Sequence, residues 1–223
     1  MKANQLEIHR QIRKFLEEKK EKVSKTQVKN LVSFNFDSKN YFFAKADERW
    51  LEWLWKNGLL DILKKPAKDP SRYSYSTPEI RYLVRMAKSE NKRTIKTIID
   101  IICDDNLATS KDKFNPELID QILRILSDWE AKNIIESLKR LEPKEKIREW
   151  IKLMSPFGIT INFSLGRILK KLVEAREYDW AIKFADYILT VKDKSDFKIE
   201  EVEIGYGIKL PKGEVSPFYI SES

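Results

Sequence analysis

Residues 119–126 read Ile-Asp-Gln-Ile-Leu-Arg-Ile-Leu, and they place hydrophobic side chains at the spacing i, i+3, i+4, i+7. These positions fall on one stripe of a 3.6-residue helix, so the segment predicts an amphipathic helix that buries its stripe against a neighbour. The same spacing occurs seven times in succession, at Ile80-Leu83-Val84-Ala87, Ile95-Ile98-Ile99-Ile102, Ile119-Ile122-Leu123-Leu126, Ala131-Ile134-Ile135-Leu138, Ile147-Trp150-Ile151-Met154, Leu165-Ile168-Leu169-Leu172 and Ala181-Phe184-Ala185-Ile188. The pattern therefore predicts a row of short packed helices.

The predicted fold class is all-α: an irregular α-solenoid of stacked antiparallel helix pairs, similar to HEAT or tetratricopeptide repeats, with a short extended C-terminal segment. Taken in pairs, the windows starting at Ile80, Ile119, Ile147 and Ala181 are 39, 28 and 34 residues apart. These intervals lie near the roughly 34 to 47 residues of known helix-hairpin repeats, although they are irregular. The predicted core includes one residue from each window: Leu83, Ile98, Ile122, Ile135, Ile151, Leu169 and Phe184.

The composition supports an ordered, water-exposed helical chain. Of the 223 residues, 42% are hydrophobic and 35% are charged, with only six Gly and a net charge of +8. A single cysteine, Cys103, excludes a disulfide framework and is compatible with a reducing compartment. The N-terminal residues contain no apolar signal-peptide core, and no apolar run approaches the roughly 20 residues of a membrane helix. We expect a soluble, cytoplasmic protein without membrane contact.

Three regions are expected. Residues 1–44 form an N-terminal basic helical cap and an aromatic loop; nine Lys or Arg against four Glu in residues 1–30 give this arm a local charge of +5. Ser24 is a candidate N-cap there, and residues 34–43 are either a packed loop or a short extended piece. Residues 45–192 form the helical-repeat body. Residues 193–223 form an extended tail of local charge −3, in which alternation from Val202 to Leu210 has the period of a strand.

Helix boundaries within the body follow recognisable signals. Thr77-Pro78-Glu79 and Asn115-Pro116-Glu117 each offer an N-cap followed by proline at the first helical position. Residues 127–130, Ser-Asp-Trp-Glu, match a capping box that would begin another helix. Gly58 is expected to end the preceding Trp-rich helix in the left-handed conformation. The tryptophans of that helix, at helical spacing, are expected in the core.

Residues 50–96 also carry a family resemblance. A Trp-rich helix ending in Lys56-Asn57-Gly58-Leu59-Leu60, a proline-containing loop and the segment Thr77-Pro78-Glu79-Ile80-Arg81-Tyr82-Leu83-Val84-Arg85-Met86-Ala87 resemble helical-repeat regions of large bacterial multidomain proteins. Some of those proteins are associated with defence against phage. The Asn115 helix start and Trp150-Ile151-Lys152-Leu153-Met154 extend the similarity over about residues 45–190. The resemblance implies a HEAT-like scaffold joined to effector parts, and it transfers no catalytic residue.

Catalytic and cofactor signatures are missing from the sequence. His9, the only histidine, is expected at the surface, so hydrolytic triads and histidine-rich metal sites lack their ligands. Asp104 and Asp105 are expected to be solvated residues at a helix end rather than a cation site. Neither a P-loop nor a dinucleotide-binding glycine motif is present. We therefore expect no enzymatic activity, no catalytic or metal-binding residues and no cofactor.

Two sets of side chains are candidates for binding. A basic ridge for a polyanion or an acidic partner is predicted at Arg81, Arg85, Lys88, Lys92, Arg93 and Lys96, with a solvated helix face as the alternative. Partner-facing aromatic side chains are predicted at Tyr73, Tyr75, Phe218 and Tyr219. Our first hypothesis is a scaffold that contacts another protein or further domains of a larger polypeptide; the alternative is a helical module that binds nucleic acid weakly through the ridge.

Overall fold

The computed structural model describes residues 2–17, 24–68, 77–155 and 159–190, and these residues are almost entirely helical. The α-helices are α1 (Lys2–Glu17), α2 (Lys25–Val32), α3 (Phe36–Lys45), α4 (Leu51–Lys56), α5 (Pro78–Met86), α6 (Lys92–Ile102), α7 (Pro116–Asp128), α8 (Ala131–Leu141), α9 (Lys146–Met154), α10 (Ile159–Glu174) and α11 (Tyr178–Thr190). Shorter elements between them are the 3₁₀ turns η2 (Glu48–Trp50), η3 (Asp61–Lys64) and η4 (Glu142–Lys144) and the hairpin strands β1 (Thr109–Ser110) and β2 (Lys113–Phe114). The all-α prediction is confirmed.

Several helix boundaries lie where local sequence signals predict them. The Asn115 side chain accepts a hydrogen bond from the Leu118 N–H at 3.2 Å and caps α7. Thr77 occupies the N-cap of α5 without a side-chain capping bond, and Pro78 follows at the first position. Gly58 has a φ of 72°, so a residue with a Cβ would be strained at the turn after α4. These boundaries confirm the expected starts and the left-handed glycine.

Residues 34–43 were expected to form a loop or an extended piece, and this prediction is wrong. Most of them lie in α3, whose N-cap Asn35 accepts a hydrogen bond from the Ser38 N–H at 2.7 Å. Phe42 and Phe43 are buried; the ring of Phe42 lies 6.3 Å from that of Phe15 in α1, and the ring of Phe43 lies 5.6 Å from that of Tyr82 in α5. Burial of these large rings outweighs the modest helix propensity of aromatic residues, which is why the polar-aromatic pattern misled the sequence reading.

The predicted capping box at residues 127–130 is also wrong. Ser127 lies inside α7, where its hydroxyl donates to the Arg124 carbonyl at 2.8 Å. The N-cap of α8 is Glu130, which makes no side-chain capping bond. Helix α7 therefore runs to Asp128, two residues beyond its predicted stripe, and its C-cap residue Trp129 is hydrogen-bonded to Ala87 as described below.

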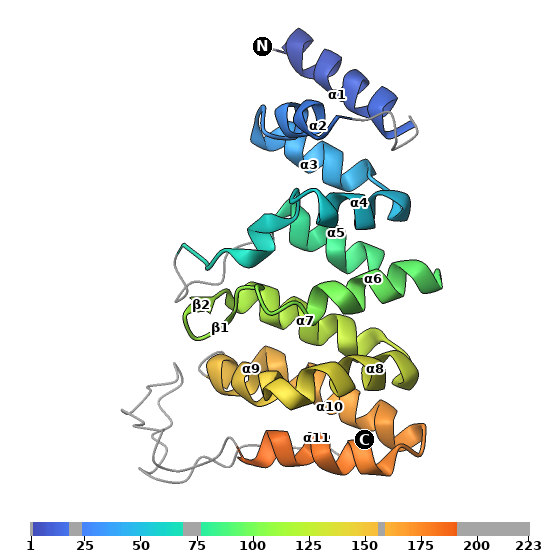
Figure 1. Cartoon of the computed structure of the whole chain (residues 1–223), viewed down its shortest axis with the longest axis vertical. Helices are drawn as coiled ribbons and strands as arrows, with labels where there is room; N and C mark the ends of the chain where they lie inside the picture. Colours follow the sequence, from blue (N-terminus) through green and yellow to red (C-terminus); the bar gives the residue numbers. More distant parts are fainter. Residues whose placement is uncertain (1, 18–23, 69–76, 156–158, 191–223) are drawn as a thin grey trace, which may run out of the picture.

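The helices stack along the long axis of the molecule from α1 at one end to α11 at the other (Figure 1). Helices α1, α3, α5, α7 and α10 contact one another in that order and form a first row. Helices α4, α6 and α8 contact one another in the same way and form a second row. Contacts of α5 with α6, α7 with α8 and α10 with α8 join the rows, and α9 is an additional helix against α7, α8 and α11.

A hydrogen bond to the end of a first-row helix recurs at a regular sequence interval. Arg85 Nη2 donates to the Ala46 carbonyl at 2.5 Å, Trp129 Nε1 to the Ala87 carbonyl at 2.9 Å, and Lys171 Nζ to the Trp129 carbonyl at 2.8 Å. The partners are 39, 42 and 42 residues apart, and the acceptors are the C-cap residues of α3, α5 and α7. Each of these bonds therefore joins the C-terminal end of one first-row helix to a side chain of the next, 39 to 42 residues further along the sequence.

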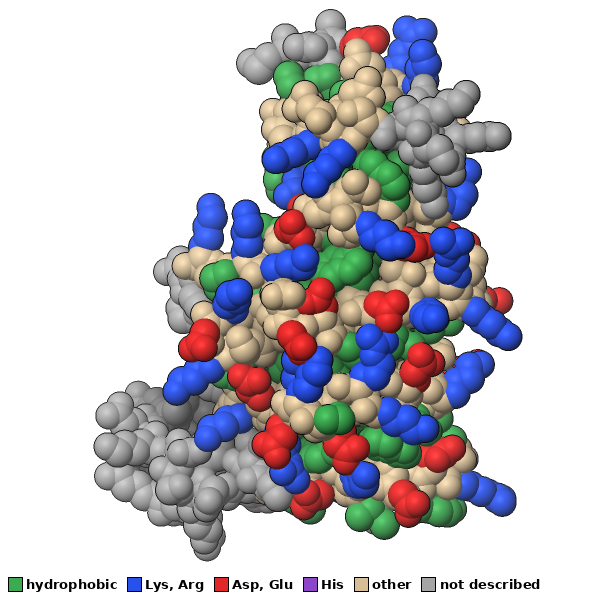
Figure 2. Space-filling model, viewed as in Figure 1, with side chains coloured by type: hydrophobic (Ala, Val, Ile, Leu, Met, Phe, Trp, Pro, Cys, Tyr) green, Lys and Arg blue, Asp and Glu red, His purple; other side chains and the backbone are tan. Residues whose placement is uncertain are grey.

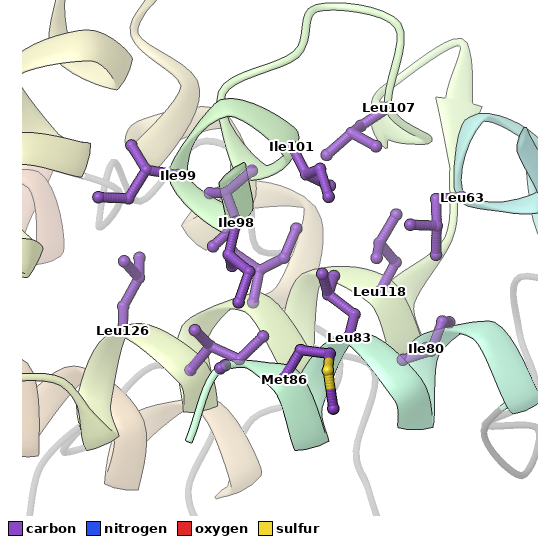
Figure 3. Packing of buried hydrophobic residues seen from close by; sticks show 14 of the residues in the cluster. Leu63, Ile80, Leu83, Met86, Ile98, Ile99, Ile101, Leu107, Leu118 and Leu126 are labelled. Carbon is purple, nitrogen blue, oxygen red and sulfur yellow. The ribbon is translucent and has the colours of Figure 1, made fainter. Parts of the chain in front are cut away.

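One hydrophobic cluster runs through the stack from Ile8 to Tyr187. Figure 3 shows its middle part, where side chains of α5, α6 and α7 such as Leu83, Ile98 and Leu118 converge. Six of the seven predicted core residues are buried, and Leu169 is half-buried. Periodicity thus identified the core of the body, and Ile8, Ile12, Phe15 and Leu16, which form a stripe at helical spacing near the N-terminus, belong to the same cluster.

Aromatic residues build the N-terminal part of the core. Trp50 is 1% exposed and lies 5.0 Å from the ring of Phe15, whereas Trp53 is half-buried at the edge of the cluster. His9 is half-buried rather than fully at the surface, because its ring stacks on Tyr41 with centroids 3.9 Å apart. The expectation of a surface histidine is corrected accordingly. The tail at residues 193–223 lies outside the described residues.

In the described ranges no helix is both long and apolar enough to cross a membrane.

Candidate protein-binding surface

The six residues of the predicted basic ridge do not lie on one helix. Arg81 and Arg85 are in α5, which ends at Met86, and Lys92 begins α6 after a turn. The prediction that Lys92, eleven residues after Arg81, continues the ridge on the same helix is therefore wrong, because the chain changes direction between α5 and α6. Arg81, Arg85 and Lys88 remain close to the first row, whereas Lys92, Arg93 and Lys96 belong to the second row.

Both arginines of α5 are tied to α3. Arg81 Nη2 donates to Asn40 Oδ1 at 2.5 Å, and Arg85 Nη2 donates to the carbonyls of Phe43 and Ala46 at 2.8 and 2.5 Å. The second contact neutralises the negative end of the α3 dipole and satisfies carbonyls that lack helical partners. Each guanidinium nevertheless carries further N–H donors and remains exposed, so both arginines combine a structural contact with a solvent-facing charge.

The second-row cations differ in how far they are neutralised. Arg93 pairs with Glu52 at 2.6 Å, and Lys56 pairs with the same carboxylate at 2.6 Å. Hydrogen bonds from Lys56 and Arg93 lower the pKa of Glu52 to about 2. The lysines at 88, 92 and 96 are exposed and have no hydrogen-bond or ion-pair partner within the part of the chain that the structure describes. Three of the six predicted ridge residues are thus engaged internally.

A hollow of about 760 Å³ lies between α3 and α5. We call it the α3–α5 hollow; its lining includes Phe36, Lys39, Phe43, Arg81, Tyr82 and Arg85. Phe36 is 68% exposed at the rim, whereas Phe43 and Tyr82 are buried beneath it. The Tyr82 hydroxyl donates to the Asp47 carbonyl at 2.8 Å, which fixes the ring. The floor of the hollow is therefore aromatic, with the Tyr82 ring held by its hydrogen bond, and cations lie at the rim.

A second hollow of about 320 Å³ continues on the other side of α5. This α5–α7 hollow is lined by Ile80, Val84, Lys88 and Gln121 and again by the two arginines of α5. The hollows therefore meet at Arg81 and Arg85. Among the described residues, four cations line the two hollows, at positions 39, 81, 85 and 88, and no carboxylate does.

Carboxylates nearby are buried beneath the first row. Glu79 and Glu117 each follow the proline that begins α5 or α7, and each is 3% exposed. Lys39 Nζ pairs with Glu79 at 2.5 Å, so this cation of the hollow is neutralised from below. Burial raises the pKa of Glu117 to about 7, helped by the neighbouring Asp120 carboxylate and opposed by Arg81 and a backbone hydrogen bond from Thr77. A protonated Glu117 leaves the positive charge of Arg81 less compensated.

Cations recur along the first row. Lys39, Arg81, Arg124 and Arg167 follow one another at intervals of 42, 43 and 43 residues. Arg124 bonds to Asp120 at 2.9 Å, and Arg167 pairs with Asp128 at 3.0 Å. These two have acid partners on the first row itself, whereas Arg81 bonds to a neutral amide. Of these four cations, Arg81 is the one that bonds to a neutral group rather than to a carboxylate in the described part of the chain.

Metal chemistry has no support among the described residues. No group of three or more His, Cys, Asp or Glu side chains lies in an arrangement that could hold a metal ion in this part of the chain. Asp105, which was expected to be solvated, pairs with Lys144 at 2.6 Å and Lys146 at 2.9 Å, and hydrogen bonds from both lower its pKa to about 2. Burial raises the pKa of the Cys103 thiol, which reduces the thiolate needed for nucleophilic chemistry.

The predicted partner-facing aromatics, Tyr73, Tyr75, Phe218 and Tyr219, lie outside the described residues. The aromatics that line the hollow instead are Phe36, Phe43 and Tyr82. Phe36 and Phe43 were missed because residues 34–43 were not predicted to be helical. At helical spacing Phe36 and Phe43 are seven residues apart and so share a face, which would have been the available signal.

No protein-family model, no curated protein and no solved structure matches the chain.

Proposed function

We propose that this chain is a non-catalytic helical-repeat scaffold, an irregular α-solenoid similar to HEAT repeats, whose role is to bind another protein or a further domain. The observation that carries the proposal is the recurring hydrogen bond to first-row C-cap carbonyls, made by Arg85, Trp129 and Lys171 about every 40 residues. Units that contact mainly their sequence neighbours are the hallmark of solenoids, whose extended surfaces serve protein recognition.

The first-row surface at α3, α5 and α7 supports a binding role. Its two hollows combine aromatic side chains with uncompensated cations, whereas the face shown in Figure 2 intermingles Lys and Arg with Asp and Glu along most of the stack. Exposed aromatic and Arg side chains are enriched where proteins bind one another. A cytoplasmic location fits the single, buried Cys103, and membership in a larger bacterial defence protein remains part of the proposal.

Photocrosslinking tests the proposal. A photoreactive residue placed at exposed Ala44, beside the α3–α5 hollow, should give a discrete protein adduct in the cells that make this protein. The matched control is exposed Ala175, in the turn after α10, which should give a different pattern or none. Reproducible adducts from Ala44 support the scaffold. Absence of protein adducts from positions 44, 84 and 88 on the first-row surface would contradict it.

The second candidate is a nucleic-acid-binding module. The observation in its favour is the exposure of Lys88, Lys92 and Lys96 together with the net charge of +8. Phosphate binding through several cations falls steeply with salt, whereas a partner anchored by apolar side chains is affected far less. Because half of the predicted ridge is engaged internally, the scaffold is the better supported of the two.

A further inference from the structure

We propose that the α3–α5 and α5–α7 hollows together bind an extended acidic segment of another protein, with an apolar side chain in the α3–α5 hollow and carboxylates on Arg81 and Arg85. This inference rests on the scaffold function and deepens it by naming the chemistry of the partner. Its basis is the juxtaposition of two apolar hollows on either side of two arginines of α5.

Shape indicates a chain-like ligand. The α3–α5 hollow, at about 760 Å³, lies within the roughly 300 to 1,000 Å³ of sites that hold drug-sized ligands. It does not end at α5, because the same two arginines also line the α5–α7 hollow of about 320 Å³. A ligand that fills both must cross α5, which suits an extended peptide better than a compact metabolite.

Charge indicates an acidic ligand. The two hollows present Lys39, Arg81, Arg85 and Lys88 without any lining carboxylate. Lys39 is neutralised by Glu79. Among the described residues, Arg81 and Arg85 donate only to neutral oxygens, and each uses its Nη2 atom for these bonds. Their Nε and Nη1 donors are oriented by these anchoring contacts, and a pre-positioned guanidinium pairs well with a carboxylate.

The apolar floor favours a peptide over a nucleic acid. Phe43 and Tyr82 are both buried below the hollow, and Phe36 is the exposed aromatic at its rim. A polyanion gains most from many cations along its backbone, and here only two guanidiniums and Lys88 are not neutralised by an acid. An acidic peptide uses both the cations and the floor, so its binding combines electrostatic steering with apolar anchoring.

Peptide display on the full chain tests the inference. Random 12-residue peptides would be selected on immobilised wild-type protein at physiological salt, and individual peptides would then be measured by fluorescence anisotropy. The expected winners carry two or more Asp or Glu near a Leu, Ile, Phe or Trp. Changing their acids to Lys should abolish binding, and raising the salt should weaken it without eliminating it.

Variants locate the binding site without removing internal contacts. Ala44 is exposed and lines the hollow, so Ala44→Glu should weaken the selected peptides about tenfold through repulsion. Ala44→Gln has nearly the same size without the charge and should change affinity less than about twofold. Phe36→Ala removes an exposed aromatic from the rim and should also weaken binding about tenfold. Circular dichroism would confirm that all three variants keep their helix content.

The outcomes separate the inference from the scaffold function. Acidic peptides that bind the wild type and lose affinity for both Ala44→Glu and Phe36→Ala support the inference. Peptides that bind Ala44→Glu as tightly as the wild type would contradict binding in the α3–α5 hollow, although they would still support the scaffold function. If no peptide is enriched, or if a mixed-sequence 20-nucleotide single strand binds and is lost with Ala44→Glu instead, the acidic-peptide inference is overturned. Binding of the single strand that is lost with Ala44→Glu would also contradict the scaffold function and favour the nucleic-acid-binding module.

Discussion

The indole Nε1 of Trp129 donates to the carbonyl of Ala87 at 2.9 Å. Trp129 is the C-cap residue of α7 and Ala87 is the C-cap residue of α5, so the bond joins equivalent ends of consecutive first-row helices. The carbonyl of Trp129 in turn accepts from Lys171 at 2.8 Å. One residue therefore connects three successive units, and it does so with a buried aromatic ring that also fills space between them.

Replacing Trp129 with Phe should destabilise the protein by about 1 to 3 kcal/mol, because the Ala87 carbonyl loses its donor while most of the ring volume is kept. Equilibrium urea unfolding measures the change. The matched control is Trp180→Phe, since Trp180 is half-buried and its indole N–H has no hydrogen-bond partner among the described residues. Equal losses in the two variants would show that the cross-unit hydrogen bond is unimportant.

Arg85→Ala should also be destabilising, by about 1 to 3 kcal/mol, because two carbonyls at the end of α3 lose a charged donor. The sequence alone predicts little effect, since Arg85 falls on the polar face of its helix. Lys88→Ala, three residues along and without a described partner, should change the free energy of unfolding by less than about 0.5 kcal/mol. Thermal unfolding compares the two, and a harmless Arg85→Ala would show that the α3 end is satisfied by water.

The helix pattern was largely predictable from the sequence, but the repeat was not. Each hydrophobic window became a helix, because apolar side chains at helical spacing must be buried. The intervals between paired windows are irregular, and α9 (Lys146–Met154) lies as an additional helix between α8 and α10. The cations at Lys39, Arg81, Arg124 and Arg167 follow one another at intervals of 42 to 43 residues, and each lies in a different first-row helix.

The candidate site was predictable only in part. Arg81, Arg85 and Lys88 are placed by their spacing opposite the buried stripe of α5, which one sequence can show. Their partners cannot be read in the same way, because Asn40 and the carbonyls of Phe43 and Ala46 lie about 40 residues earlier. Contacts between residues so far apart in the sequence depend on how the helices stack. Because α3 was not predicted to be a helix, the hollow that it forms with α5 could not be predicted either.

Stability should depend on Glu117 between about pH 4.5 and 7. The pKa of Glu117 is raised from 4.5 to about 7, first by burial and then by the Asp120 carboxylate. Below pH 4.5 the carboxyl is protonated in both states and carries no penalty. As the pH rises towards 7, the unfolded chain releases this proton before the folded chain does, so the free energy of unfolding falls, by at most about 3 kcal/mol.

Glu117→Gln tests this effect, because it removes the titrating carboxyl and keeps a side chain of nearly the same size. The difference in unfolding free energy between the variant and the wild type should therefore shift in favour of the variant from pH 4.5 to 7 and level off above it. Urea unfolding across that range provides the measurement. A constant difference over the whole range would mean that Glu117 titrates normally in the folded protein.

Nucleic-acid binding should be weak, non-selective and lost near physiological salt. Only Lys88, Lys92 and Lys96 of the predicted ridge are without internal partners in the described structure, and a charge of +8 is dispersed among 35 acids. Fluorescence anisotropy with single- and double-stranded oligonucleotides at about 50 and 200 mM salt checks this. Tight, salt-resistant and sequence-selective binding would reverse the ranking of the two proposed functions.

The proposed scaffold requires that the ends of first-row helices about 40 residues apart in the sequence are hydrogen-bonded to each other. The environment of the Trp129 indole proton tests this requirement most directly. In a ¹⁵N-labelled sample, the Trp129 indole resonance is assigned by its loss in Trp129→Phe. We predict nuclear Overhauser contacts from this proton to Ala87 and Lys88 and slow exchange with solvent, because the indole N–H is buried and bonded to the Ala87 carbonyl. Contacts confined to α7 and α8, with rapid exchange, would contradict the proposed register.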